Sequence, residues 1–153
     1  RWEAMPENLN EQSKVGEFDI VIGCVDTRAA RRTILSCIEG QRSRVAYWLD
    51  LGNLSDRGQF ILGQPLNARN RRRKSRLRTV AELFPEIVRD DLPEDGPSCS
   101  SAEALERQEP FVNPLLAQHA LALMGQLFRC GGISQHGAFV NARTNWTQPI
   151  QLN

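Results

Sequence analysis

The stretch FDIVIGCVDTRAARRTIL, residues 18–35, decides the fold class of this chain. Its apolar, β-branched beginning predicts a buried strand over residues 18–25. An apolar stripe at helical spacing, followed by Gly40, predicts a helix over residues 27–39. A single carboxylate, Asp26, stands between the two elements. Its position raises the question of whether it caps the helix or holds a ligand.

Two further strands are expected downstream of this helix. The run RVAYWLDL predicts a strand over residues 44–51, and GQFILG predicts one over residues 58–63, with a turn at Gly52-Asn53. A strand, a helix and a strand in this order indicate a parallel pair with a right-handed crossover. The sequence therefore predicts an open α/β sheet.

A long loop excursion is expected over residues 64–99. Seven basic residues fall within residues 69–78, and residues 79–109 carry nine acids against two arginines. The only regular element expected there is a short helix around VAELFPEIV. The basic run contains no aromatic residue for base stacking. We therefore interpret it as a solvated, mobile loop rather than a binding site for phosphate or an acidic partner, and we do not expect a nucleic-acid partner.

The C-terminal third of the chain predicts two helices and two strands. The Ser-x-x-Glu spacing of a capping box starts a helix over residues 100–108. A longer helix is expected over residues 114–129, ended by Cys130-Gly131-Gly132. Strands over residues 137–144 and 149–152, joined by a polar turn, would close the sheet.

Composition bounds the class of protein. With 153 residues, 41% hydrophobic residues and a net charge of +1, the chain has the size and balance of one globular domain, residues 1–153. We expect no membrane partner, because no apolar run approaches the length of a membrane span and the start is no signal peptide. The chain opens at Arg1 rather than Met, which fits either processing or a piece of a longer protein.

The four cysteines point to a reducing compartment. No Cys-x-x-Cys pair is present, so a zinc site is not expected. We interpret the cysteines as reduced thiols of a cytoplasmic protein, with Cys24 and Cys37 in the core. His119 and His136 lack a metal-ligand partner at helical spacing and are interpreted as structural.

Two residues are candidates for chemistry. Asp26 lies where the carboxyl end of a strand meets a helix, and there a carboxylate can bind Mg²⁺ together with phosphate oxygens. The alternative is that Asp26 is the N-cap of the helix. Cys99 lies in a Gly/Pro/Ser-rich loop just before a helix, where the dipole favours a nucleophilic thiolate. Its alternative is a small packed side chain.

Together these segments resemble a known family. VIGCVDTRAARRTI is similar to the strand-to-helix junction of the ThiF/MoeB/HesA superfamily, the ubiquitin-activating-enzyme-like adenylyltransferases. WEAMPENLN, YWLDLGN, LFPEI, PSCSSAEALERQEPFVN and HGAFVN resemble, more specifically, the ThiF-type proteins of bacterial PRTRC systems. The likeness extends over most of the chain.

The resemblance implies a partial Rossmann-like sheet that binds ATP and Mg²⁺ and adenylates the C-terminal carboxylate of a ubiquitin-like or sulfur-carrier protein. It implies that Asp26 is the magnesium ligand, that Arg32 contributes to cofactor binding, and that Cys99 forms a thioester. It also implies a homodimer.

The family's phosphate-binding elements precede the region that matches this chain. The sequence contains neither G-x-G-x-x-G nor G-x-x-x-x-G-K-[ST]. The chain is therefore interpreted as the C-terminal part of an adenylation domain, and we expect it to be inactive by itself. The alternative is a non-catalytic module for protein binding or dimerisation, docking through the helix at residues 114–129.

Overall fold

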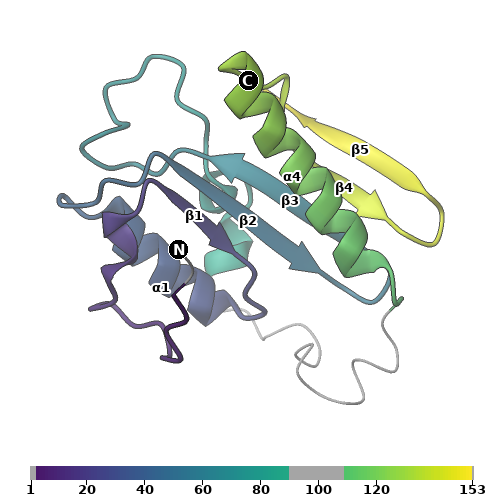
Figure 1. Cartoon of the computed structure of the whole chain (residues 1–153), viewed down its shortest axis with the longest axis horizontal. Coiled ribbons are helices and arrows are strands. Elements are labelled where there is room, and N and C mark those ends of the chain that lie inside the picture. Colours follow the sequence, from purple (N-terminus) through teal and green to yellow (C-terminus); the bar gives the residue numbers. More distant parts are fainter. Residues whose placement is uncertain (1–2, 90–108, 153) are drawn as a thin grey trace.

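The computed structural model describes residues 3–89 and 109–152. These residues form an α/β fold around one five-stranded open sheet (Figure 1). The spatial order of the strands follows the sequence: β1 (Ile20–Gly23), β2 (Tyr47–Asn53), β3 (Arg57–Gly63), β4 (Gln135–Asn141) and β5 (Trp146–Gln151).

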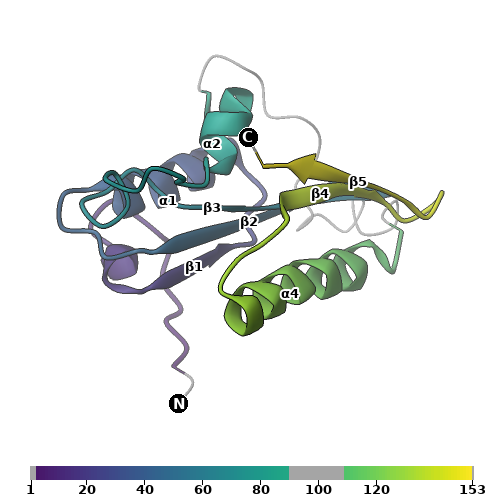
Figure 2. The same ribbon diagram turned by 90° about the horizontal axis from the view of Figure 1, so that it is seen from above.

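Helices cover both faces of the sheet. One face carries α1 (Arg28–Glu39) and the short α2 (Val80–Leu83), and the other carries α4 (Val112–Cys130) (Figure 2). Two 3-10 turns complete the described elements, η1 (Lys14–Glu17) and η2 (Pro85–Val88). Within the two described ranges, no helix has the length and apolarity needed to cross a bilayer.

The predicted strand–helix–strand unit is confirmed. β1 and β2 are parallel, with Gly23 opposite Asp50, and α1 connects them. The remaining strand pairs are antiparallel. The sheet is therefore mixed, and its parallel end is compatible with part of a Rossmann-like fold.

The prediction of a turn at Gly52-Asn53 is wrong. Both residues lie inside β2, where they are opposite Gln59 and Gly58 of β3. The chain turns over residues 54–56 instead. The turn propensity of this Gly-Asn pair is overridden, because β2 continues to pair with β3 through both residues.

Other expected elements are close to their predicted places. The short helix around VAELFPEIV is observed as α2 followed by η2. The last two strands begin earlier than expected, and residues 142–145 form the polar turn between them. The helix expected over residues 100–108 lies outside the described residues.

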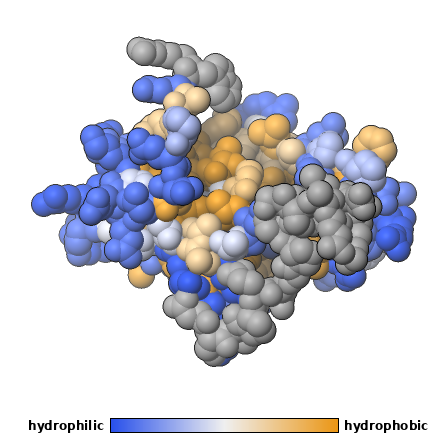
Figure 3. Space-filling model, turned by 90° about the horizontal axis from the view of Figure 1, so that it is seen from below, coloured by the Kyte–Doolittle hydropathy of each residue, from blue (hydrophilic) through white to orange (hydrophobic). Residues whose placement is uncertain are grey.

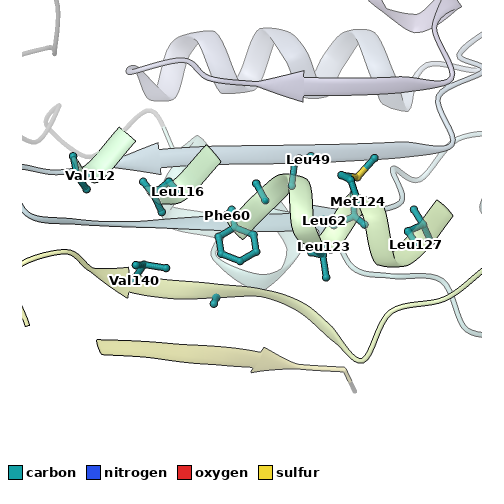
Figure 4. Close-up of a cluster of buried hydrophobic side chains, with 11 residues drawn as sticks. Leu49, Phe60, Leu62, Val112, Leu116, Leu123, Met124, Leu127 and Val140 are labelled. Atoms are coloured by element: carbon teal, nitrogen blue, oxygen red, sulfur yellow. The ribbon is translucent and has the colours of Figure 1, made fainter. Parts of the chain in front are cut away.

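The helix α4 forms the larger core with the sheet. It ends at Gly131, whose φ of 69° is left-handed and suits glycine. Its apolar face packs on β2, β3 and β4, as Figure 4 shows. The buried side chains of this core are Leu49, Phe60, Leu62, Val112, Leu116, Ala120, Leu123, Met124, Leu127, Ala138 and Val140.

A second core lies on the opposite face, beneath α1 and α2. Its buried members are Val21, Ile34, Ile38, Val45, Trp48, Ile61 and Val80. Adjacent residues Leu49 and Trp48 enter different cores because side chains alternate across a strand. This second core holds α1 against the parallel strands and so fixes the start of the helix.

Strand β4 approaches β3 closely at Gly137. The register of β4 with β5 shifts between Gln135 and Gly137, as in a β-bulge. A Cβ on Gly137 would lie 1.8 Å from the carbonyl oxygen of Phe60 on β3. Only a residue without a side chain fits there.

We predict that Gly137→Ala destabilises the chain by about 2–3 kcal/mol, because the methyl group forces β4 away from β3. Urea denaturation with matched m-values measures the change in the free energy of unfolding. The control is Gly132→Ala, since a Cβ there meets no atom within 4 Å. Equal stability of the two variants would contradict the close approach.

Candidate functional site

The candidate site lies at the carboxyl end of β1. This strand ends at Gly23, and three residues later the exposed Asp26 precedes α1. The N-cap of α1 is Thr27, whose Oγ1 accepts a hydrogen bond from the backbone N–H of Ala30 at 3.1 Å. The alternative that Asp26 itself caps the helix is therefore wrong.

This arrangement places Asp26 between a strand end and a helix N-terminus. In open α/β sheets, ligands bind at the carboxyl ends of the strands. A capping threonine satisfies one backbone N–H of the first turn. The exposed position of Asp26 suits a carboxylate that meets a ligand from solvent.

A buried ion pair lies immediately behind this junction. The Nε of Arg31 on α1 donates to Oδ1 and Oδ2 of Asp50 on β2, at 3.2 and 3.3 Å. The Arg31 side chain is 7% exposed, and that of Asp50 is fully buried. Nη2 of Arg31 also reaches the carbonyl oxygen of Leu51 at 3.4 Å. The pair therefore joins the end of the first turn of α1 to the middle of β2.

Burial dominates the electrostatics of Asp50. It raises the pKa of this carboxyl to about 6, against the opposing charge and hydrogen bonds of Arg31. Partial burial, followed by the charge of Asp50, also raises the pKa of the Cys24 thiol. Cys24 is accordingly a poorer thiolate than an ordinary cysteine.

Gly23 makes room for this pair. A Cβ at Gly23 would lie 3.1 Å from Nε1 of Trp48, 3.2 Å from Cδ1 of Ile34 and 3.4 Å from Oδ1 of Asp50. All three side chains are buried. The glycine in the Gly-Cys-Val link therefore lets α1 and the side chains of β2 pack tightly at the strand end.

Arg32 lies apart from the Arg31–Asp50 pair. Its Nη1 donates to the carbonyl oxygens of Val88 and Arg89, at 3.4 and 3.3 Å. It also lines an open cleft of about 550 Å³ along α1, together with Glu11, Ala29, Thr33, Leu35, Ser36, Glu39 and Val88. The structure thus joins Arg32 to η2 and the residue that follows it.

The cysteines differ in part from their expected places. Cys24 was expected in the core but is exposed, because it follows β1 rather than continuing it; Cys37 is half-buried. Cys99 lies outside the described residues. His136 is buried against the carbonyl oxygen of Leu62, and His119 stacks on Phe60, as expected of structural histidines.

Among the residues that the structure describes, no group of three or more His, Cys, Asp or Glu side chains is placed to hold a metal ion. Asp26 would thus supply a single carboxylate, which is within the range that Mg²⁺ uses when phosphates and water complete its shell. A scan of protein-family models matched no family, and a search of curated proteins found no match either.

Arg31 and Asp50 were not among the residues predicted for the site. The available signal was a lone carboxylate inside the apolar strand YWLDL, because a buried charge requires a partner. Two adjacent arginines follow the junction, and only helix geometry decides that Arg31 faces the sheet. The pair is a positioning element of the site, since its atoms are withdrawn from solvent.

We predict that Asp50 makes a stability contribution that falls as the pH rises. The pKa of about 6 in the folded chain exceeds the ordinary value, so between roughly pH 4 and pH 6 the folded state retains a proton that the unfolded state loses. The free energy of unfolding of the wild type relative to Asp50→Asn should decrease across this window, on the order of 2–3 kcal/mol. Urea denaturation at several pH values measures it.

Asp19 provides the opposite control. Its hydrogen bond and ion pair with Arg69 lower the pKa of the Asp19 carboxyl. Stability relative to Asp19→Asn should therefore rise with pH, with the change lying below the window of Asp50. A wild-type advantage over Asp50→Asn that grows between pH 4 and pH 6 would refute the desolvated carboxyl.

Proposed function

We propose that this chain is the C-terminal part of a ThiF-like, ATP-dependent adenylyltransferase. It would activate the C-terminal carboxylate of a ubiquitin-like or sulfur-carrier protein in the cytoplasm. The observation that supports this proposal best is the exposed Asp26 at the carboxyl end of a parallel strand, next to a helix that another residue caps. That is where a nucleotide-binding α/β sheet receives its ligand.

The proposed metal role requires only one protein carboxylate. Asp26 would hold Mg²⁺ through a carboxylate oxygen, with ATP phosphates and water as the other ligands. The bound ion would neutralise charge on the departing pyrophosphate. Asp50 does not compete for the ion, because its carboxylate oxygens are buried against Arg31.

Arg32 carries a smaller part of the proposal. Its guanidinium donates to the carbonyl oxygens of Val88, the last residue of η2, and of Arg89. To meet a phosphate it would exchange these neutral acceptors for a charged one, which makes stronger hydrogen bonds. Its proposed cofactor role therefore requires the Arg32 side chain to leave the carbonyl oxygens of residues 88 and 89.

The exposed edge strand β1 is a further observation in favour of a larger parent protein. β1 lies at one edge of the sheet, and Ile22 on it is 52% exposed. Figure 3 shows an apolar patch at the centre of one face of the molecule. Parallel strands normally have both faces covered, so further strands and helices beyond β1 would complete the sheet and supply the phosphate-binding elements.

Cys99 would carry the second half of the reaction. Its thiolate would attack the carbonyl carbon of the acyl-adenylate, forming the C–S bond as the C–O bond to AMP breaks. The products are a thioester and AMP, so atoms and charges balance without an oxidant. This role rests on the family resemblance.

We predict that Asp26→Ala abolishes ATP–pyrophosphate exchange in the longest native form of the protein, assayed with its acceptor. Without the Asp26 carboxylate, Mg²⁺ would no longer be held beside the ATP phosphates, and the charge on the departing pyrophosphate would not be neutralised. The control is Glu17→Gln, an exposed carboxylate before the amino end of β1, which should retain full exchange.

Cys99→Ser separates the two chemical steps. It should retain exchange, which precedes thioester formation, and lose any reducer-sensitive adduct with the acceptor. Undiminished exchange in Asp26→Ala would overturn the metal assignment. An adduct that persists in Cys99→Ser would overturn the thioester role.

A second candidate is a protein-binding or dimerisation module. The observation that favours it is an apolar strip on the outer face of α4, where Leu121 is 62% and Phe128 is 66% exposed. The two residues are seven apart and therefore share one face of the helix. Such a pair can anchor a homodimer interface.

We predict for this candidate that Leu121→Glu/Phe128→Glu converts a dimer into a monomer, because charges enter the apolar interface. Light scattering after gel filtration measures the mass. The matched control is Ala122→Glu, an exposed position one residue further along α4. A monomeric wild type at high micromolar concentration would contradict this interface.

A further inference from the structure

The basic segment at residues 69–78 belongs to a loop that is tied to the core. The side-chain Nδ2 of Asn67 donates to the carbonyl oxygens of Ile38 and Val45, at 3.0 and 2.9 Å, and to Oγ of Ser43 at 3.3 Å. Its Oδ1 accepts from the backbone N–H groups of residues 69 and 70. Asn67 is buried, so it joins the loop to the end of α1 and the start of β2.

Asn70 provides a second anchor. Its Nδ2 donates to the carbonyl oxygens of Val45, Ala46 and Pro65, at 3.0, 3.3 and 3.1 Å. The residue is fully buried. Buried amides with several backbone partners hold a loop in one conformation, because breaking them leaves unsatisfied polar groups. The basic loop therefore has internal supports that a merely solvated loop lacks.

Ion pairs flank these anchors on both sides. Nη1 of Arg69 pairs with Asp19 and donates to the carbonyl oxygen of Arg44 at 2.7 Å. Arg76 pairs with Glu82, with Nη1 to Oε2 at 2.9 Å, and donates to the carbonyl oxygen of Gln64. Two of the seven cations of the run are thus used to fix the loop.

Four consecutive cations between these ties are presented to solvent. Arg71, Arg72, Arg73 and Lys74 are all exposed. Within the described parts of the chain, no side-chain hydrogen bond or ion pair engages them. Arg42 and Arg44, also exposed, belong to the segment between α1 and β2 to which Asn67 and Asn70 bind. The loop therefore concentrates unneutralised positive charge on a fixed support.

We propose that residues 71–74, together with Arg42 and Arg44, form a binding surface for the phosphate backbone of nucleic acid. Arginine suits phosphate because its planar fork donates two parallel hydrogen bonds. Contact would be independent of sequence, since the surface offers charge without an aromatic residue on which bases could stack. This differs from the expectation drawn from the sequence, which assumed a mobile loop.

The chemistry of the surface favours a nucleic acid over an acidic protein. Stable protein interfaces are centred on buried apolar or aromatic anchors with a polar rim. Here the largest exposed apolar side chain of the described loop is Leu66, which precedes both anchors. Affinity for a phosphate backbone needs no such anchor, because it comes from the release of condensed counterions.

The surface is separate from the candidate site. The loop leaves the sheet where β3 ends and β2 begins (Figure 1). Asp26 follows the carboxyl end of β1, and β1 is parallel to β2, so the two sites lie at opposite ends of the sheet. The proposal therefore does not depend on adenylation.

Fluorescence anisotropy of a labelled 20-base-pair duplex, titrated with the full chain over a series of salt concentrations, tests this surface. The wild type should bind with a log–log salt slope of about −3 or steeper, as expected for at least four phosphate contacts. Arg72→Gln/Arg73→Gln should flatten the slope by about 2 and weaken binding about tenfold or more near 0.1 M salt.

The control is Arg57→Gln/Arg143→Gln, which removes the same charge from exposed residues paired with Asp56. It should leave the slope unchanged, and thermal melting verifies that both variants fold. Equal losses in the two variants would overturn the surface, because net charge alone would then explain binding. No binding of the duplex, or preferential binding of a polyglutamate peptide through the loop, would overturn it as well.

Discussion

The buried ion pair between Arg31 and Asp50 is the interaction on which the arrangement of the junction depends. It connects α1 to β2 behind the carboxyl end of β1, where both charged side chains are buried. Removing one partner of such a pair leaves an uncompensated charge in a low-dielectric interior. The pair thereby fixes which face of α1 meets the sheet, and with it the place of the residues between β1 and the helix.

Parallel pairing of β1 and β2 makes the same junction possible. Because α1 crosses over between them, the carboxyl ends of both strands and the beginning of the helix lie at the same end of the sheet. Because Gly23 has no side chain, Trp48, Ile34 and Asp50 can pack closely behind this end of the sheet. The antiparallel strands β3, β4 and β5 then extend the sheet, and α4 covers the opposite face.

Much of the fold could be predicted from local patterns. The apolar run before Gly23, the helical stripe and the run YWLDL identified β1, α1 and β2, because strand and helix periods differ. Gly52-Asn53 misled the prediction, since turn propensity is a local property and strand pairing is not. Asp26 was located correctly as the charged residue of the junction. That Thr27 caps the helix, and that Arg31 rather than Arg32 meets Asp50, depends on three-dimensional geometry.

The two edges of the sheet differ in how they resist further pairing. β5 is largely exposed and polar, and it contains Pro149, which has no backbone N–H to offer an incoming strand. β1 contains no proline and exposes Ile22, and among the described residues it pairs with β2 alone, so its other edge is an open template for another strand. Aggregation of the chain through strand pairing should therefore start at β1.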